Sequence, residues 1–348
     1  MQKNNSKRIL IIRFSAFGDV AMTIPVICSL GKQYPQLDIT VLSRDKWEPL
    51  FASLPGNIHF MGVDFIRCYK GFQGLNRLYC ELKAMRFDYV ADFHSVLRSR
   101  YLCFRYKMHL VPVAFIDKGR RGKRKLVRRR KKVLQAQKPS FNRYADVLKD
   151  LGFPIDIDFV SIYKTGKGDF SLIQSLIGEK IGKKWIGIAP FAKHKGKIYP
   201  LAKLERVIAY FAARPDVKVF LFGMGIHEHE VINDWVGKYP SLFSICDKMD
   251  LHAELVLMSY LDVMLSMDSA NMHLASLVDT PVVSIWGSTH PFAGFMGWRQ
   301  LPSNVIQRDL SCRPCSVYGQ KTCWKGNYEC LTLITPEEII EKVNTLLL

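Results

Sequence analysis

The chain has 348 residues, of which 48% are apolar and 23% charged, and its net charge is +19. This ordinary globular composition excludes a disordered or fibrous protein, and the length suggests two domains. No apolar run approaches the roughly 18 residues that a membrane span needs, and charged residues interrupt the first apolar run, so neither a span nor a secretory signal peptide is expected. We therefore expect a cytoplasmic protein whose nine cysteines are thiols rather than a disulfide framework.

Short apolar segments rich in β-branched residues alternate with longer amphipathic segments along the chain. The expected strands are residues 9–14, 39–43, 89–93, 111–116, 185–189, 217–222, 263–267 and 281–286. The expected helices include residues 75–86, 141–151, 201–213 and 251–260. This alternation favours an α/β fold in which parallel sheets carry helices on both faces.

The pattern restarts after about residue 165, which predicts two Rossmann-like, doubly wound domains that face each other. We expect a first domain over residues 1–165, a second over 166–330, and a last helix within 331–348 that could pack back on the first domain. Ligands of such folds bind at the carboxyl ends of the strands, so the cleft between the domains is the expected site.

The positive charge is concentrated in residues 98–138. This segment contains sixteen basic residues and a single acidic one, so it carries +15 of the net charge of +19. A patch of this kind fits a nucleic acid, an anionic membrane surface or a polyanionic substrate, or else it is a solvated basic loop. The run lacks the interleaved aromatic residues of single-strand binders, so nucleic acid is not favoured.

Asp19 follows the first expected strand and lies where the next helix begins. Gly18 before it permits a tight turn between strand and helix. At the carboxyl end of a strand, the carboxylate of Asp19 could act as a general base for a substrate hydroxyl. Alternatively, Asp19 only caps the helix, and the spacing by itself favours this second interpretation.

A second polar turn follows the expected strand at 263–267 and leads into a helix. The free N–H groups and the dipole of that helix start suit a pyrophosphate, and Asp268 and His273 would lie near it. Capping by Asp268 or Ser269 and simple packing of His273 remain alternatives. Lys195 and Lys197 precede another helix, where one of them could reach a phosphate or could remain a solvated loop lysine.

Four cysteines near the end of the chain have the spacing C-x2-C-x7-C-x6-C. They could hold a structural zinc ion, but the second pair lacks the usual C-x2-C spacing, so free thiols are favoured and no metal site is assigned. These residues are Cys312, Cys315, Cys323 and Cys330.

Several motifs together resemble those of glycosyltransferase family nine, the lipopolysaccharide heptosyltransferases. The matching segments are residues 9–20, 23–25, 92–99, 268–275, 280–283 and 287–289. They occur in the order of that family and cover nearly the whole chain. Three features depart from its usual pattern. Ala270 stands where the family has glycine, Ser288 stands where it has proline, and Lys195 is close enough to Lys197 to compete for the phosphate role.

The resemblance implies a GT-B fold and the inverting, metal-independent transfer of a heptose from ADP-heptose to the inner core of lipopolysaccharide, without a cofactor. It implies Asp19 as the general base and Lys197 as the cation that meets the departing ADP. The donor-binding residues that we assign on this basis are Glu228 (with Glu230 as the competing alignment), Asp268, Ser269, Ala270, Asn271, His273, Ser288 and Thr289. The assigned acceptor-binding residues are Ser15, Gly18, His94, Arg98, Arg120 and Arg124.

The expected partners are a nucleotide-sugar donor, an anionic glycolipid acceptor and the inner leaflet of the plasma membrane. The basic segment would meet the last two, so we expect a peripheral protein at the inner face of that membrane. Transfer of a different nucleotide-activated sugar onto a cell-surface glycan is the main alternative. A sugar-nucleotide-binding relative without catalysis and a basic nucleic-acid-binding protein are others, but the latter leaves the Asp19 and Asp268 motifs unexplained.

Overall fold

The computed structural model describes residues 6–164 and 166–348, and its internal contacts group them into two units. The first unit runs up to Lys118 and resumes over Pro139–Ile162. The second unit combines Gly119–Lys138 with Tyr163–Leu348. We expected the whole basic segment in the first domain, but its residues 119–138 pack with the second unit. The expected boundary residue, Thr165, lies outside the described residues.

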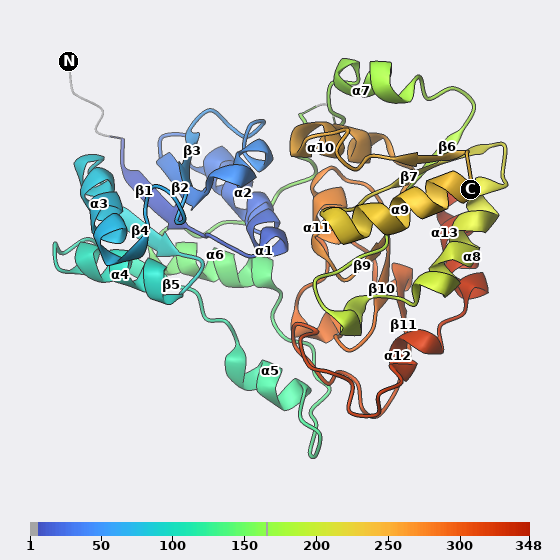
Figure 1. Ribbon diagram of the computed structural model, residues 1–348. Coiled ribbons are helices and arrows are strands. Elements are labelled where there is room, and N and C mark those ends of the chain that lie inside the picture. The colour runs from blue at the N-terminus through green and yellow to red at the C-terminus, as the bar shows by residue number, and fades with distance from the viewer. Residues whose placement is uncertain (1–5, 165) are drawn as a thin grey trace. The chain divides into compact units, whose positions relative to one another are not determined.

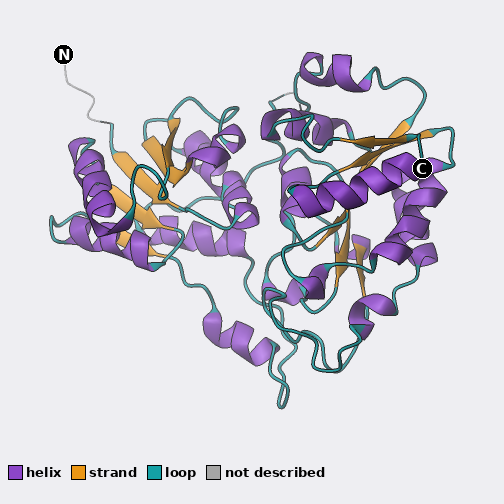
Figure 2. Cartoon of the chain, in the orientation of Figure 1, coloured by secondary structure: helices purple, strands orange, loops and turns teal. Residues whose placement is uncertain are grey.

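The first unit is built on a five-stranded parallel sheet in the order β3-β2-β1-β4-β5 (Figures 1 and 2). Its strands are β1 (Arg8–Ile12), β2 (Asp38–Arg44), β3 (Ile58–Val63), β4 (Tyr89–Asp92) and β5 (Val113–Phe115). β1 lies in the middle because its run of four apolar residues, Ile9 to Ile12, buries both faces completely.

Helices cover both faces of this first sheet. They are α1 (Phe17–Ala21), α2 (Ile24–Gln33), α3 (Gly71–Ala84), α4 (Leu97–Lys107) and α6 (Ser140–Asp150), with a 3-10 turn η1 (Asp45–Leu50). Leu10 and Ile12 of β1 pack in one core with the apolar residues of α3 and α4. The alternate residues of β1 point to the other face, where α2 and α6 contact each other.

The second unit contains a six-stranded parallel sheet in the order β11-β10-β9-β6-β7-β8. Its strands are β6 (Lys184–Ala189), β7 (Val217–Leu221), β8 (Leu242–Ser244), β9 (Val263–Met267), β10 (Val282–Trp286) and β11 (Val305–Gln307). The residues of β9 and β10 are all buried, as expected for central parallel strands.

The second unit also has helices on both faces of its sheet, although its α5 stands away from the sheet (Figure 1). They are α5 (Arg120–Leu126), α7 (Ser171–Ile177), α8 (Leu201–Ala212), α9 (Ile226–Lys238), α10 (Leu251–Tyr260), α11 (Ala270–Leu277), α12 (Glu329–Thr332) and α13 (Pro336–Leu347), with 3-10 turns η2 (Lys195–Lys197), η3 (Pro291–Ala293) and η4 (Pro302–Asn304). Among the described residues, no helix is both long and apolar enough to cross a membrane.

The last helix, α13, packs within the second unit rather than on the first. Its apolar residues Ile339, Val343 and Leu347 are spaced four apart, so they form one stripe that enters the core of the second sheet beside α8. It therefore does not pack back on the first domain, as the sequence had suggested it could.

The expected strands are all present, and so is the parallel α/β architecture that they predicted. The sequence pattern missed β3, β8 and β11. β8 and β11 are only three residues long, and β3 is an edge strand whose exposed positions obscure any apolar run. Because every strand in each unit is parallel, all of its carboxyl ends lie at one edge of its sheet, where the motif residues follow β1, β4, β9 and β10.

Candidate active site

The turn after β1 holds Asp19 by only one of its two carboxylate oxygens. Asp19 lies in the first turn of α1, and its Oδ2 accepts the N–H of Ala16 (3.2 Å) and pairs with the guanidinium of Arg13 (2.7 Å). Oδ1 has no partner among the described residues, and the side chain is 30% exposed. The capping and the base interpretations are therefore compatible, because the cap uses Oδ2 and leaves Oδ1 able to accept a proton.

Arg13, which the motif analysis did not assign to the site, fixes the orientation of Asp19. Its side chain is buried, donates to the carbonyl oxygen of Phe93 (2.7 Å) and lies 5.9 Å from the centre of the Tyr144 ring. A guanidinium held at these points offers Asp19 a pre-oriented donor, so little freedom remains to be lost when the pair forms.

The turn after β4 is organised by Asp92, which is fully buried. Its carboxylate accepts the N–H groups of His94 (2.9 Å) and Ser95 (2.7 Å) and the hydroxyl of Ser99 (2.9 Å). Burial raises the pKa of Asp92, although these three bonds oppose the shift. Asp92 is thus a structural residue that shapes the turn carrying His94.

His94 is an electrically neutral side chain close to Asp19. Its Nδ1 accepts the N–H of Phe14 (3.3 Å), and the imidazole is buried. Burial is the largest cause that lowers the pKa of His94 to about 3, and nearby Arg13 and Lys118 lower it further, whereas Asp19 raises it. At neutral pH the ring therefore carries one proton, which the bond to Nδ1 assigns to Nε2.

The remaining expected acceptor residues are divided between the two units. Ser15 and Gly18 lie in the same turn as Asp19, at the end of β1. Arg98 is exposed in the first turn of α4, with its guanidinium 4.8 Å from the centre of the Phe65 ring. Arg120 and Arg124 are exposed on α5, which belongs to the second unit.

A lysine amine is held at the carboxyl edge of the second sheet. Nζ of Lys197, in η2, lies 2.9 Å from Oδ2 of Asp268 and donates to the main-chain oxygen of Asp268 (2.9 Å). The hydroxyl of Thr289 donates to the same Oδ2 (2.8 Å). Asp268 ends β9 and Thr289 follows β10, so two neighbouring strands and a loop supply this cluster.

Lys197 rather than Lys195 makes this contact. Lys195 points toward the ring of Tyr328, at 5.6 Å from its centre. An ammonium group has three N–H donors. Asp268 uses two of those of Lys197, and the structure shows no further partner for the third among the described residues.

Close packing fixes the backbone around Lys197. The main-chain oxygen of Gly196 accepts the N–H of Ser288 (2.8 Å), and a Cβ at Gly196 would collide with the Ser288 hydroxyl. Gly319 has a φ of +85° and lies against Lys197, where a Cβ would be 2.8 Å from Cγ. The hydroxyl of Ser288 is buried and has no hydrogen-bond partner within the described chain.

The segment after Asp268 leads directly into α11. Ser269 has the extended backbone of a helix N-cap, but its hydroxyl lies 3.2 Å from that of Ser266 instead of capping the helix. Ala270 and Asn271 form the first turn of α11 and are partly exposed, whereas His273 is buried. The structure therefore leaves the N–H groups at the start of α11 beside Asp268.

Glu228 lies in the first turn of α9, after β7. One carboxylate oxygen accepts the N–H of Met224 (2.8 Å). The competing residue, Glu230, is 69% exposed and lies 3.8 Å from His227. Only Glu228 is joined to the loop at the carboxyl end of β7.

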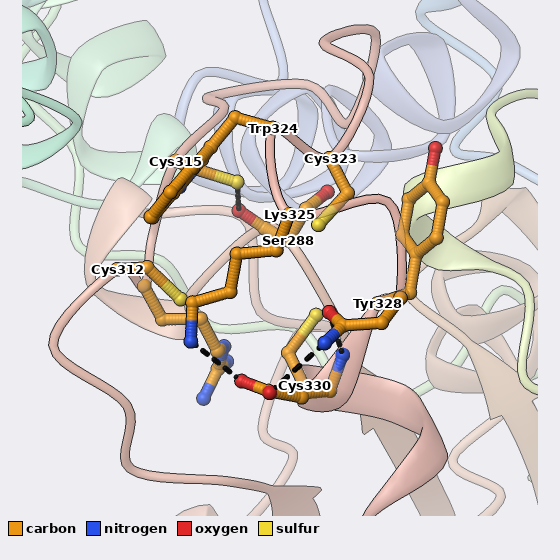
Figure 3. Close-up of a pocket in the computed structure, with 11 residues that line it drawn as sticks. Ser288, Cys312, Cys315, Cys323, Trp324, Lys325, Tyr328 and Cys330 are labelled. Atoms are coloured by element: carbon orange, nitrogen blue, oxygen red, sulfur yellow. Dashed lines mark hydrogen bonds and ion pairs between the residues drawn. The ribbon is translucent and has the colours of Figure 1, made fainter.

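The four clustered cysteines line one small cavity of about 20 Å³ (Figure 3). All four are free thiols, and burial raises the pKa of Cys315 and raises that of Cys330 to about 11. Over residues 6–164 and 166–348, no group of three or more histidine, cysteine, aspartate or glutamate side chains is arranged so that it could hold a metal ion.

The segment that carries these cysteines is attached to the turn that carries Thr289. The buried guanidinium of Arg313 donates to the carbonyl oxygens of Gly287 (2.5 Å) and Thr289 (2.8 Å). The N–H of Cys315 donates to the carbonyl oxygen of Ser288 (3.1 Å). The cysteine segment thus supports the loop beside Lys197 and Asp268, a role that the cysteine spacing did not suggest.

Residues 75–325 match the profile of Glycosyltransferase family 9 (heptosyltransferase). The chain belongs to this family. The motifs read from the sequence had indicated the same family, and the match spans the turns of His94, Lys197, Asp268 and Thr289.

Individual relatives agree with this membership. Lipooligosaccharide heptosyltransferase 2 of Campylobacter jejuni is 28% identical over 171 residues, which are 48% of this chain and 52% of that protein. The chain thus spans about half the length of this curated relative in the match.

Two solved structures of the family have the same fold. The family 9 glycosyl transferase of Veillonella parvula has a TM-score of 0.75 at 21% identity, with 98% of this chain and 97% of that chain covered. The heptosyltransferase WaaC of E. coli, solved with ADP, has a TM-score of 0.67 at 17% identity, with 97% and 99% covered. The fold class expected from the sequence is confirmed.

Proposed function

We propose that the protein transfers a heptose from ADP-heptose, with inversion, to a sugar hydroxyl in the inner core of a lipopolysaccharide or lipooligosaccharide. The observation that carries this proposal is the position of the Lys197 amine. Asp268 holds this amine beside the start of α11 through two of its N–H groups, which leaves the third N–H to bind a ligand. An ammonium group beside a helix start suits a diphosphate, and the chain has the fold of a sugar-transferase family. The ADP seen with E. coli WaaC supports adenine as the base of the nucleotide.

The donor would be held by groups from the second unit. The third N–H of Lys197 and the N–H groups at the start of α11, around Ser269, Ala270 and Asn271, bind the diphosphate. The carboxylate oxygen of Glu228 that Met224 does not use accepts a ribose hydroxyl. Thr289 and Ser288 keep the loop after β10 in place against Asp268 and Gly196, and His273 is buried in α11.

Asp19 would supply the general base. Oδ1 removes the proton from the acceptor hydroxyl while that oxygen attacks the anomeric carbon of the heptose. The bond from the anomeric carbon to the phosphate oxygen breaks on the opposite side, and ADP leaves with the electron pair. Lys197 stabilises the negative charge that develops on the leaving ADP, and no step in this scheme requires a metal ion.

The acceptor would be recognised by positive charge as well as by the residues around Asp19. Ser15, Gly18, His94 and Arg98 meet the acceptor sugar in the first unit. The exposed basic residues of 119–138, including Arg120 and Arg124, meet the anionic groups of the glycolipid or of the inner leaflet. The protein would then work as a peripheral protein at the inner face of the plasma membrane.

Thermal unfolding with ADP, UDP, GDP or CMP, each with and without EDTA, tests the donor. A ligand at one hundred times its dissociation constant stabilises the protein by about 2.7 kcal/mol, which is readily detected. Selective stabilisation by ADP that persists in EDTA is the expected result. Preference for UDP or GDP would retain a transferase and replace the heptose donor by another nucleotide sugar, and the absence of any shift would contradict the proposal.

A further inference from the structure

Helix α4 of the first unit has apolar residues on two opposite faces. One face, with Leu102, Cys103 and Tyr106, is buried in the core of the unit. A helix turns by about 100° per residue, so residues spaced four, three and four positions apart share one face. The face opposite the core is lined in this way by Leu97, Tyr101, Phe104 and Met108, which we call the outer stripe. Its Leu97, Phe104 and Met108 are exposed.

The outer stripe continues onto the neighbouring helix α3. Phe72, in the first turn of α3, is exposed, and its ring meets the ring of Tyr101 edge-on, with the ring centres 5.2 Å apart. Helices α3 and α4 pack side by side on one face of the first sheet (Figure 1). Single exposed apolar residues are normal on a protein surface, but a row of them across two helices indicates a surface that a partner covers.

Cations border the outer stripe on both sides. The helical spacing divides the four basic residues of α4 between the two edges, with Arg98 and Arg105 along one edge and Arg100 and Lys107 along the other. None of the four makes an ion pair within the described residues; Arg105, for example, donates to the hydroxyl of Tyr101 (2.8 Å). Residues 97–116 contain no aspartate or glutamate. The exposed face of α4 is therefore apolar in the middle and positive at both edges.

An anionic bilayer has the chemistry that complements this face. On such a surface, apolar side chains enter the boundary between head groups and acyl chains, while long basic side chains reach back to the phosphates. A second copy of the chain is a poorer partner. A symmetric contact through this face would place the same cations of the two copies opposite one another, and like charges in contact oppose association.

The outer stripe begins next to the candidate site. Leu97 is the first residue of α4 and follows His94 by three positions, and His94 lies close to Asp19. A bilayer on the outer stripe would thus bring lipid head groups to the edge of the first sheet that carries Asp19.

We propose that α4 and the Phe72 end of α3 dock the first unit on an anionic bilayer, with the outer stripe inserted between the lipids and the bordering cations on the lipid phosphates. This inference rests on the proposed function, because a glycolipid acceptor is presented at such a surface. It assigns an apolar membrane contact to the first unit, whereas the basic residues 119–138 belong to the second unit.

Sedimentation with vesicles of phosphatidylglycerol and phosphatidylcholine in equal amounts tests the docking. Replacing Phe104 and Met108 together by serine should weaken binding by about tenfold or more, because two apolar side chains no longer insert. The same ratio between variant and wild type should persist at about 1 M salt, where the screening length falls to about 3 Å and charge attraction is largely lost. Persistence at high salt separates the outer stripe from attachment by the basic segment.

The double replacement of Ile181 and Leu301 by serine is the matched control. These side chains are 73% and 59% exposed, and those of Phe104 and Met108 are 59% and 65% exposed. Because all four lie on the surface, both double variants should keep the melting temperature of the wild type. The control should bind the vesicles within about twofold of the wild type.

A second measurement reports insertion directly. Bromine atoms on the acyl chains quench an indole that reaches them. In vesicles of brominated lipids, Phe104→Trp should therefore show more quenching than the wild type, whereas the control Leu301→Trp should not.

Unchanged vesicle binding in the Phe104 and Met108 variant, or no additional quenching in Phe104→Trp, would overturn the docking face. A wild-type dimer that the same double variant dissociates, with vesicle binding unchanged, would assign the face to a second copy and overturn the proposal as well. The thermal shift with ADP is measured in parallel on the same proteins. If ADP stabilises the wild type and the vesicle results fail, the docking face is wrong and the proposed function stands. If ADP also fails, the proposed function is wrong too.

Discussion

The pair of Lys197 and Asp268 allows a quantitative test of the second unit. The side chain of Asp268 is 5% exposed and that of Lys197 16% exposed, so neither charge is well hydrated. In Lys197→Met the carboxylate keeps only the hydroxyl of Thr289 and the charge is buried without a counter-charge. Removing one partner of a buried pair typically costs about 3–5 kcal/mol, which we expect for this variant.

Replacing both partners should restore most of that loss. In the double variant Lys197→Met with Asp268→Asn, no charge is buried, and the amide oxygen of asparagine can still accept the hydroxyl of Thr289. The unfolding free energies of the wild type, the two single variants and the double variant form a cycle, whose coupling we expect to be about 3 kcal/mol. An apparent melting temperature should fall by roughly 10 °C in Lys197→Met, at about 2–4 °C per kcal/mol for a unit of this size.

Lys238→Met provides the matched control in the same unit. Lys238 pairs with Glu205 at 2.9 Å, but its side chain is 56% exposed, so its replacement should leave the unfolding free energy close to that of the wild type. Urea unfolding followed by tryptophan fluorescence measures all five proteins. If Lys197→Met is no less stable than Lys238→Met, or if the two changes simply add, the pair is solvated in solution and the argument for a preformed phosphate-binding lysine fails.

Three further outcomes are expected. Asp19→Asn should lower kcat by about 10²–10⁴-fold in a transfer assay with ADP-heptose, because the amide oxygen can still meet Arg13 but cannot take a proton. The ADP-induced thermal shift should stay unchanged. A kcat similar to that of the wild type would remove the base role of Asp19. Burial raises the pKa of Glu254 to about 7, with Asp250 as a further cause, so this carboxyl favours the folded state when it is protonated. The free energy of unfolding should therefore fall by up to about 3 kcal/mol as the pH rises from about 4 to 7. Glu254→Gln should flatten that decline in urea unfolding at several pH values, and an unaltered decline would contradict the shift. Replacing Arg128, Arg129 and Arg130 by serine should weaken binding to anionic vesicles by about 100-fold, at about 1 kcal/mol for each charge. Binding to neutral vesicles should not change. If the variant and the wild type sediment equally with anionic vesicles, this segment has no membrane role.

The sequence pattern was sufficient for the sheets because parallel strands are buried on both faces and show as apolar runs. It also placed Asp19 and Asp268 at strand ends, since a polar turn after such a run marks the end of the strand. The pairing of Lys197 with Asp268, 71 positions apart, could not be predicted in this way. That contact depends on the path of η2 and on the glycines that let it approach the turn after β10.

The location of residues 119–138 was also beyond the pattern. A basic run has no apolar stripe that would indicate which core it joins. The structure attaches it to the second unit through polar contacts instead, such as the amine of Lys132 on the carbonyl oxygens of Ser311 (3.1 Å) and Arg313 (2.7 Å).

Asp19 and Asp268 occupy equivalent positions in their units, each after a central strand and each beside one cation, yet their environments suit opposite roles. Asp268 is nearly inaccessible, and its Oδ2 is shared by Lys197 and Thr289, so its carboxylate is suited to hold a lysine in place. Asp19 is 30% exposed and both of its contacts are made by Oδ2. A general base needs an oxygen that the substrate can reach, and a group that orients a phosphate-binding lysine does not. Exposure and the division of contacts between the two oxygens, rather than the motif, therefore favour Asp19 as the base and Asp268 as the residue that positions Lys197.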